Sequence, residues 1–169
     1  MPSSQFRSVN SPRQLGSFPV ANVLVNPYAC VVSLQVERGE CVDRPRLLIA
    51  DDHQIVIETV IDLLGRKYEI VGEAHDGLEL YAKALELCPD IIVSDITMPF
   101  MSGIEAALQL RAAGCEARIV FLTIHNNVEY FEACRRAGAC GYVLKNRMAA
   151  ELIPAIDHAL AGESFVSAV

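Results

Sequence analysis

From residue 46 onward, short apolar runs alternate regularly with longer stretches in which apolar residues recur every three or four positions. Short apolar runs are typical of buried β-strands, and the longer spacing is typical of helices that bury one face. Strands are expected at residues 46–50, 69–73, 91–94, 119–122 and 142–144. Helices are expected at about 55–64, 76–88, 103–112, 127–138 and 149–161. Five predicted strands thus alternate strictly with five predicted helices.

Strict alternation of strands and helices predicts a parallel sheet with helices on both faces. The runs at 91–94 and 119–122 are almost entirely apolar, as expected for central strands covered on both sides. Residues 45–169 are too few for the six-stranded sheet of dinucleotide-binding proteins, so we expect the flavodoxin-like strand order 2-1-3-4-5. The predicted fold class is α/β, a five-stranded parallel sheet with five helices on its two faces.

The beginning of the chain differs from the rest. Residues 1–17 are rich in Ser, Pro, Arg and Asn, and the stretch up to residue 44 has no sustained hydrophobic period. We expect residues 1–44 to form an N-terminal extension that is largely disordered or weakly structured. Whether the extension is functional or results from an upstream start codon is left open. A compact domain is expected at 45–165, with a C-terminal tail at 166–169.

Charge and hydrophobicity limit the classes of function. The chain has a formal net charge of −7, and residues 45–169 carry ten Lys and Arg against eighteen Asp and Glu. Phosphate contacts need clustered basic residues, so direct nucleic-acid binding by this chain is disfavoured. No segment approaches the roughly 20 consecutive apolar residues of a transmembrane helix, and no two cysteines have the Cys-x-x-Cys spacing of a zinc site. We therefore expect a cytoplasmic protein without membrane contact.

Polar residues follow four of the predicted strands, at the points where those strands end. Asp51 and Asp52 follow the first strand, and Asp95 follows the third. Thr123 and Lys145 follow the fourth and the fifth. Open α/β sheets bind ligands at the carboxyl ends of their strands, so we expect these side chains to share one rim. Adjacent Asp residues are also common as helix caps, but the addition of Asp95 and Lys145 favours a site.

Three carboxylates that lie close together need a compensating positive charge. A hard divalent cation with oxygen ligands supplies it, and Mg²⁺ suits a site with one or two carboxylates and several waters. An aspartate can attack phosphorus to give an aspartyl phosphate, a reaction that depends mainly on positioning and on neutralisation of charge. Lys145 can neutralise phosphoryl oxygens and Thr123 can donate one hydrogen bond to them. Each of these two residues taken alone is an ordinary strand-end residue.

Four sequence motifs together resemble the receiver domain of two-component response regulators. They are the pair Asp51-Asp52, the stretch from Asp95 to Gly103 with its Met-Pro pair, the pair Leu122-Thr123, and the stretch from Gly141 to Lys145. The sequence at residues 47–53 and 137–142 is similar to that of the NarL/FixJ-type subgroup. The resemblance covers about residues 45–165.

The resemblance implies a role for each polar residue of the rim. Asp95 would be the phosphoacceptor and would receive the phosphoryl group from a phosphohistidine. Asp52, Asp95 and the Thr97 backbone carbonyl would bind Mg²⁺ directly, and Asp51 would act through water. Lys145 would pair with the phosphoryl oxygens.

The resemblance also implies a conformational switch. Thr123 would move towards the phosphate and let Tyr142 turn inward, which changes the face made by the fourth helix, the fifth strand and the fifth helix. Thr97 and His125 lie two residues beyond Asp95 and Thr123, where side chains in this family tend to tune hydrolysis of the phosphate.

The implied partner is a sensor histidine kinase or a phosphotransfer protein, and a homodimer formed on phosphorylation is left open. The chain would catalyse only its own phosphorylation and slow dephosphorylation, so it is not expected to be a turnover enzyme. An alternative within the family is the receiver fragment of a NarL/FixJ-type DNA-binding transcription regulator. An alternative of another class is a haloacid dehalogenase-like phosphohydrolase with an aspartate nucleophile. That class normally carries Asp-x-Asp, whereas Thr97 follows Asp95 at that spacing here.

Overall fold

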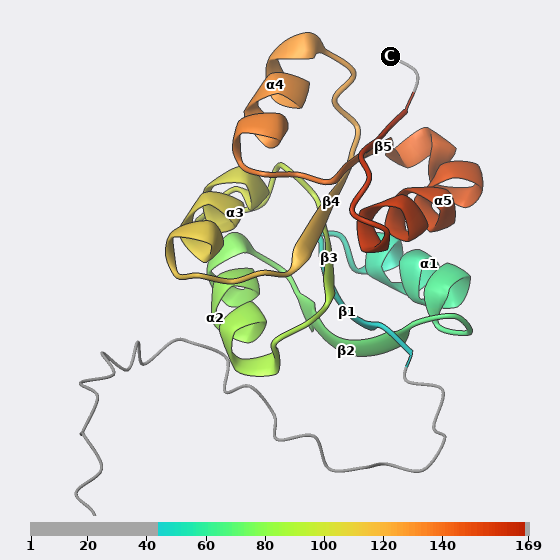
Figure 1. The fold of residues 1–169 in the computed structure, drawn as a ribbon, viewed down its shortest axis with the longest axis horizontal. Helices are drawn as coiled ribbons and strands as arrows, with labels where there is room; N and C mark the ends of the chain where they lie inside the picture. The colour runs from blue at the N-terminus through green and yellow to red at the C-terminus, as the bar shows by residue number, and fades with distance from the viewer. Residues whose placement is uncertain (1–43, 168–169) are drawn as a thin grey trace, which may run out of the picture.

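The computed structural model describes residues 44–167, which form three layers with a parallel sheet in the middle (Figure 1). The strands are β1 (Arg46–Ala50), β2 (Glu69–Ala74), β3 (Ile91–Ser94), β4 (Arg118–Thr123), β5 (Gly141–Leu144) and β6 (Phe165–Val166). The helices are α1 (Gln54–Leu64), α2 (Gly77–Leu87), α3 (Gly103–Ala112), α4 (Val128–Arg136) and α5 (Met148–Leu160), with a short 3₁₀ turn η1 (Lys145–Arg147). In Figure 1, α2, α3 and α4 lie on one side of the sheet, and α1 and α5 lie on the other.

The strand order is β2-β1-β3-β4-β5-β6, and all five neighbouring pairs are parallel. The predicted α/β class, the order of the first five strands and the five helices are confirmed. The expected number of strands was one too low, because β6 pairs with β5 through only two residues, Phe165 and Val166. A two-residue strand has no hydrophobic period of its own, so only its partner strand defines it.

The sheet separates two apolar layers, because successive side chains of a strand point to opposite faces. In β1, Leu48 and Ala50 pack towards α2 and α3, whereas Leu47 and Ile49 pack towards α1 and α5. Every residue of β3 and β5 is buried. Since the faces of these strands are occupied by apolar packing, their polar chemistry is confined to the residues that follow their carboxyl ends.

Helix caps and one glycine place the loops at that end of the sheet. Asp76 and Asn127 cap α2 and α4, because their side chains accept hydrogen bonds from the first turns of these helices. Ser102 forms a capping box at the start of α3, which the sequence pattern had not indicated. A Cβ atom at Gly103 would lie 2.0 Å from the Asp95 carbonyl oxygen, so only glycine lets α3 begin this close to β3.

The predicted extension at residues 1–43 and the last two residues, 168 and 169, lie outside the described part of the chain. Val166 and Ser167, which lie beyond the boundary expected at residue 165, pack against β5. None of the helices between residues 44 and 167 is long and apolar enough to cross a membrane.

Candidate functional site

The strand order brings two carboxylates together at the carboxyl ends of β1 and β3. These strands are neighbours, and Ala50 pairs with Ser94. The next residues are Asp51 and Asp95, which are only 2% and 5% exposed. The Asp95 amide donates a hydrogen bond to the Ala50 carbonyl at 2.8 Å. The site therefore holds two buried carboxylates on adjacent strands.

Lys145 links the two buried carboxylates. Its Nζ atom lies 2.6 Å from Asp51 Oδ2 and 2.7 Å from Asp95 Oδ2. The contact with Asp95 is a hydrogen bond, whereas that with Asp51 Oδ2 is an ion pair without good hydrogen-bond geometry. Burial lowers the pKa of Lys145, but its close contacts with Asp51 and Asp95 and the negative charges of these two groups outweigh burial, and the pKa lies above its usual value. Lys145 thus stays charged and offsets one of the two negative charges.

The two oxygens of Asp95 have different surroundings. Oδ1 accepts a hydrogen bond from the Ile96 amide at 2.6 Å, and Oδ2 accepts one from Lys145. The Ser94 hydroxyl donates to the Asp95 carbonyl at 2.8 Å. The carboxylate is thereby held in one orientation at the end of β3, as a positioned nucleophile requires.

Asp52 and His53 extend the acidic site towards solvent. Ligand atoms of Asp51, Asp52 and His53 all lie within 4.8 Å of one another. His53 Nδ1 is 2.7 Å from Asp52 Oδ1 and 3.4 Å from Asp51 Oδ1. Carboxylate oxygens are the ligands that Mg²⁺ prefers, and Asp51 Oδ2 is a buried oxygen with no directed hydrogen bond. The residues present therefore fit a Mg²⁺ ion.

No role had been predicted for His53 from the sequence. In the structure His53 contacts Asp52, whereas Lys145 contacts Asp51 and Asp95. The only signal in the sequence was the position of His53 directly after the acidic pair. The role of the Thr97 carbonyl as a ligand stays a prediction.

Thr123 and Tyr142 are joined through the backbone of His125. Thr123 is fully buried, and its Oγ1 accepts a hydrogen bond from the His125 amide at 3.2 Å. The Tyr142 hydroxyl donates to the His125 carbonyl at 2.7 Å. The Tyr142 ring lies inside the protein, in edge contact with Phe131, and burial raises its pKa to about 12, with further contributions from Cys134 and Tyr130.

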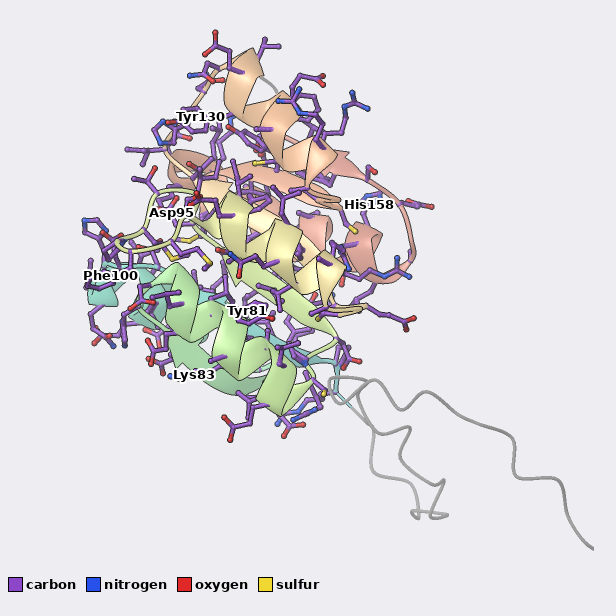
Figure 2. The ribbon with its side chains drawn as sticks, turned by 90° about the vertical axis from the view of Figure 1, so that its left-hand side faces the viewer. Tyr81, Lys83, Asp95, Phe100, Tyr130 and His158 are labelled. Carbon is purple, nitrogen blue, oxygen red and sulfur yellow. The ribbon has the colours of Figure 1, made fainter. Side chains whose placement is uncertain are left out.

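The His125 ring spans the β3–α3 and β4–α4 loops. Its Nε2 atom is 2.8 Å from Thr97 Oγ1. On the other side the ring stacks on Tyr130, with ring centroids 4.0 Å apart. Figure 2, which looks onto α2, α3 and α4, shows Asp95 and Tyr130 towards the same side of the molecule and His158 towards the opposite side. The contact between Thr97 and His125 joins the two residues that were expected to tune hydrolysis of the phosphate.

An open pocket of about 220 Å³ lies beside Lys145, which contacts both buried carboxylates. Thr123 and Lys145 both line it, together with Ile124, Asn126, Leu144 and Asn146. An anion in this pocket can meet a hydroxyl, an ammonium group and two amides at once. Asn126 had not been singled out from the sequence, because it belongs to no recognisable motif.

Comparison with known proteins identifies relatives of this arrangement. Residues 47–157 match the family model of the response regulator receiver domain. The chain is 39% identical over 129 residues to YxjL, an uncharacterized transcriptional regulatory protein of Bacillus subtilis (strain 168), and the match covers 75% of this chain and 59% of that protein. It is 36% identical over 124 residues to the oxygen regulatory protein NreC of Staphylococcus epidermidis, covering 72% of this chain and 57% of NreC.

A solved structure has the same architecture. It is that of a two-component response regulator of the LuxR family from Aurantimonas sp. SI85-9A1, with a TM-score of 0.69 and 40% sequence identity. The match covers 72% of this chain and 89% of that one. The chain spans a little under 60% of the length of the two curated relatives.

Proposed function

Because the chain belongs to the response regulator receiver domain family, of the type found in NarL- and LuxR-family regulators, we propose that it is a phosphorylation-driven switch with Asp95 as the phosphoacceptor. The observation that carries this proposal is the buried Asp95 carboxylate, held by the Ile96 amide and by the Lys145 ammonium group. The receiver domain is a signalling module. Catalysis by the chain of its own phosphorylation and slow dephosphorylation is part of the proposal.

In the proposed reaction a carboxylate oxygen of Asp95 attacks the phosphorus atom of the donor. The bond from phosphorus to the donor's leaving group breaks, and its electron pair departs with that group. Negative charge on the phosphoryl oxygens is met by Lys145 and by a hydrogen bond from Thr123. Asp52, Asp95 and the Thr97 carbonyl are the proposed direct ligands of Mg²⁺, and Asp51 would act through water. The ion would supply further neutralisation of charge when bound.

The contacts of His125 suggest how phosphorylation is read. Thr123 Oγ1 accepts from the His125 amide, so a Thr123 hydroxyl that turns to the phosphate leaves this bond. The same backbone segment accepts the Tyr142 hydroxyl through the His125 carbonyl. Movement of Thr123 would therefore shift the position at which Tyr142 is held, and with it the face made by α4, β5 and α5.

The proposed partner is a sensor histidine kinase or a phosphotransfer protein, and a homodimer on phosphorylation is compatible with the proposal. The proposal includes a cytoplasmic location for the protein. Two relatives are named as regulatory proteins, one of them transcriptional, so the output that we propose as an alternative is control of transcription. Control of transcription would not require this acidic chain to bind nucleic acid directly. The family match disfavours the phosphohydrolase alternative.

Phosphorylation by acetyl phosphate and Mg²⁺ tests the proposal, with intact mass as the measurement. We expect the wild-type protein to gain one phosphoryl group and Asp95→Asn to gain none, since an amide is a poor nucleophile. Asp62→Asn, at an exposed position of α1, is the matched control and should be phosphorylated like the wild type. Absence of phosphate on the wild type, or equal phosphate on Asp95→Asn, would show that the assignment of Asp95 is wrong.

A further inference from the structure

The last described residues bind directly to the strand that leads into the site. The Phe165 amide donates to the Cys140 carbonyl at 3.0 Å, and the Ser167 amide donates to the Tyr142 carbonyl at 2.8 Å. Ser167 is 1% exposed, although a serine near the end of such a segment would ordinarily face water. Its burial calls for a structural reason.

The Ser167 hydroxyl makes two hydrogen bonds, one with the residue before η1 and one with the first turn of α5. It accepts from the Leu144 amide at 3.1 Å, and it donates to Oε2 of Glu151 in the first turn of α5. The other oxygen of Glu151, Oε1, accepts from Arg147 Nη1 at 2.8 Å. We call Leu144, Arg147, Glu151 and Ser167 the C-terminal latch.

The latch holds both ends of a turn that has Lys145 as its first residue. Leu144 comes directly before Lys145, and Arg147 is the last residue of η1. Among residues 44–167, β6 is the last strand at this edge of the sheet and pairs only with Gly141 and Tyr142 of β5, so the Leu144 amide is held by the Ser167 hydroxyl. Besides the pairing of Leu144 with Thr123 in β4, the backbone from which the Lys145 side chain starts is therefore held by Ser167 and Glu151.

The placement of Lys145 matters because a long, flexible side chain has to bring one atom close to two carboxylates. A lysine side chain has four rotatable bonds and loses much conformational freedom when its end is fixed. Here the Nζ atom must lie within 2.7 Å of both Asp51 and Asp95. Misplacement of a catalytic group by about 1 Å can cost about a hundredfold in rate.

We propose that Ser167 is a positioning residue that acts through Leu144 and Glu151 to place Lys145 for phosphoryl transfer. The proposal rests on the proposed function, because it assumes that Lys145 serves Asp95. It assigns a role in the site to a residue that lies beyond the last helix. Coupling is reciprocal, so an aspartyl phosphate bound by Lys145 would in turn tighten the latch.

The test measures the initial rate of phosphorylation by acetyl phosphate at saturating Mg²⁺. Ser167→Ala and, from the other side of the same hydrogen bond, Glu151→Ala are each expected to slow the reaction about tenfold. Ser164→Ala, at an exposed position three residues earlier, should react like the wild type. Each variant is also unfolded with urea. A native baseline that extends well beyond zero urea establishes that the protein measured in the assay is folded.

A double-mutant cycle separates positioning from a merely structural effect. If Ser167 acts through Lys145, Ser167→Ala should cause no further loss in a Lys145→Gln background. Wild-type rates for folded Ser167→Ala and Glu151→Ala, or the same tenfold loss in the Lys145→Gln background, would overturn the positioning role alone. A wild-type protein that gains no phosphate would instead overturn the proposed function.

Discussion

At the scale of single residues, His125 is the point where three parts of the site meet. Its ring contacts Thr97 and Tyr130, its amide donates to Thr123, and its carbonyl accepts from Tyr142. The backbone contacts belong to the proposed switch, whereas the ring covers the space next to the β3–α3 loop. Substitution of the side chain therefore separates control of water access from the switch itself.

His125→Ala is expected to shorten the lifetime of the aspartyl phosphate, by roughly two- to tenfold. Without the imidazole, Thr97 loses its partner and water gains access from the side on which Tyr130 stacks. The measurement is the decay of phosphorylated protein followed by intact mass. His158→Ala, on α5 towards the other side of the molecule (Figure 2), is the control. Equal decay rates for wild type and His125→Ala would dispose of this role.

Phe100 is a residue whose backbone and side chain are both unfavourably placed. It has φ of 63° and is 86% exposed, in the loop between β3 and α3. A left-handed conformation costs an ordinary residue about 1–2 kcal/mol, and asparagine less. The exposed ring recovers little of this cost by burial.

Phe100→Asn is therefore expected to raise the free energy of unfolding by up to about 1 kcal/mol. Urea unfolding followed by circular dichroism measures it. Phe100→Ala removes the same ring and keeps the backbone cost, so it should show little gain. Equal stabilities for Phe100→Asn and Phe100→Ala would contradict the backbone argument, and a loss shared by both variants relative to the wild type would mean that the ring matters here.

At the scale of elements, α4 and α5 are anchored to very different degrees. α5 buries Leu152, Ala155, Ile156 and Ala159, whereas Cys134 is the one fully buried residue of α4. Local opening requires least free energy where few apolar contacts are broken. Of these two elements of the proposed output face, we therefore expect α4 rather than α5 to move when Thr123 and Tyr142 change position.

Hydrogen bonds from Lys67 and Tyr68 add to the apolar packing that holds α5. Asp157 of α5 accepts hydrogen bonds from Lys67 Nζ and, at 2.7 Å, from the Tyr68 hydroxyl, both in the segment that leads into β2. Burial raises the pKa of Asp157, but these hydrogen bonds and the Lys67 charge outweigh it, and the pKa lies below its usual value. A carboxylate whose pKa is depressed by folding stabilises the fold above its unfolded pKa and loses this contribution as pH falls through the folded pKa.

Asp157→Ala is expected to lower the free energy of unfolding by about 1 kcal/mol at pH 7, because the Tyr68 hydroxyl loses its acceptor. The group is half exposed, so solvent screening limits the share of the Lys67 ion pair. The difference from wild type should narrow as the pH falls below about 4. Urea unfolding at several pH values measures it, with Asp62→Asn as control, and a difference that widens on acidification would contradict the assignment.

At the scale of the whole molecule, the described domain is an acidic body whose most concentrated negative charge is on one rim. Residues 45–169 have eighteen acidic against ten basic side chains. In the described part of the chain, the ion-pair partners of Asp51, Asp52 and Asp95 are Lys145 and His53. A bound divalent cation would relieve this repulsion in the folded state alone, because the unfolded chain separates the carboxylates.

Mg²⁺ is therefore expected to stabilise the protein against unfolding by about 2.7 kcal/mol when its concentration is a hundred times the dissociation constant. Thermal unfolding with MgCl₂, against NaCl of equal ionic strength, measures the effect. Asp52→Asn should lose most of it and Asp62→Asn none of it. An equal Mg²⁺ effect in Asp52→Asn would show that the cation binds elsewhere.

The sequence by itself determined the α/β class, the order of five strands and the family. The class follows from local patterns, since each strand is marked by its own apolar run, whereas the strand order came from the flavodoxin-like fold that the number of residues favours. The same reasoning predicted that Asp51, Asp95 and Lys145 would share one rim, and the structure places them in contact. The roles of these residues stay predictions until phosphorylation is measured.

Only the tertiary structure decided the contacts between residues that no local pattern relates. Ser167 reaches Leu144 across 23 residues, His125 reaches Thr97 across 28, and β6 exists only because β5 offers it a free edge. Such pairings depend on how the packed helices and strands place distant segments. A period of two or of three to four residues carries no information about them, because it describes a single element and not its neighbours.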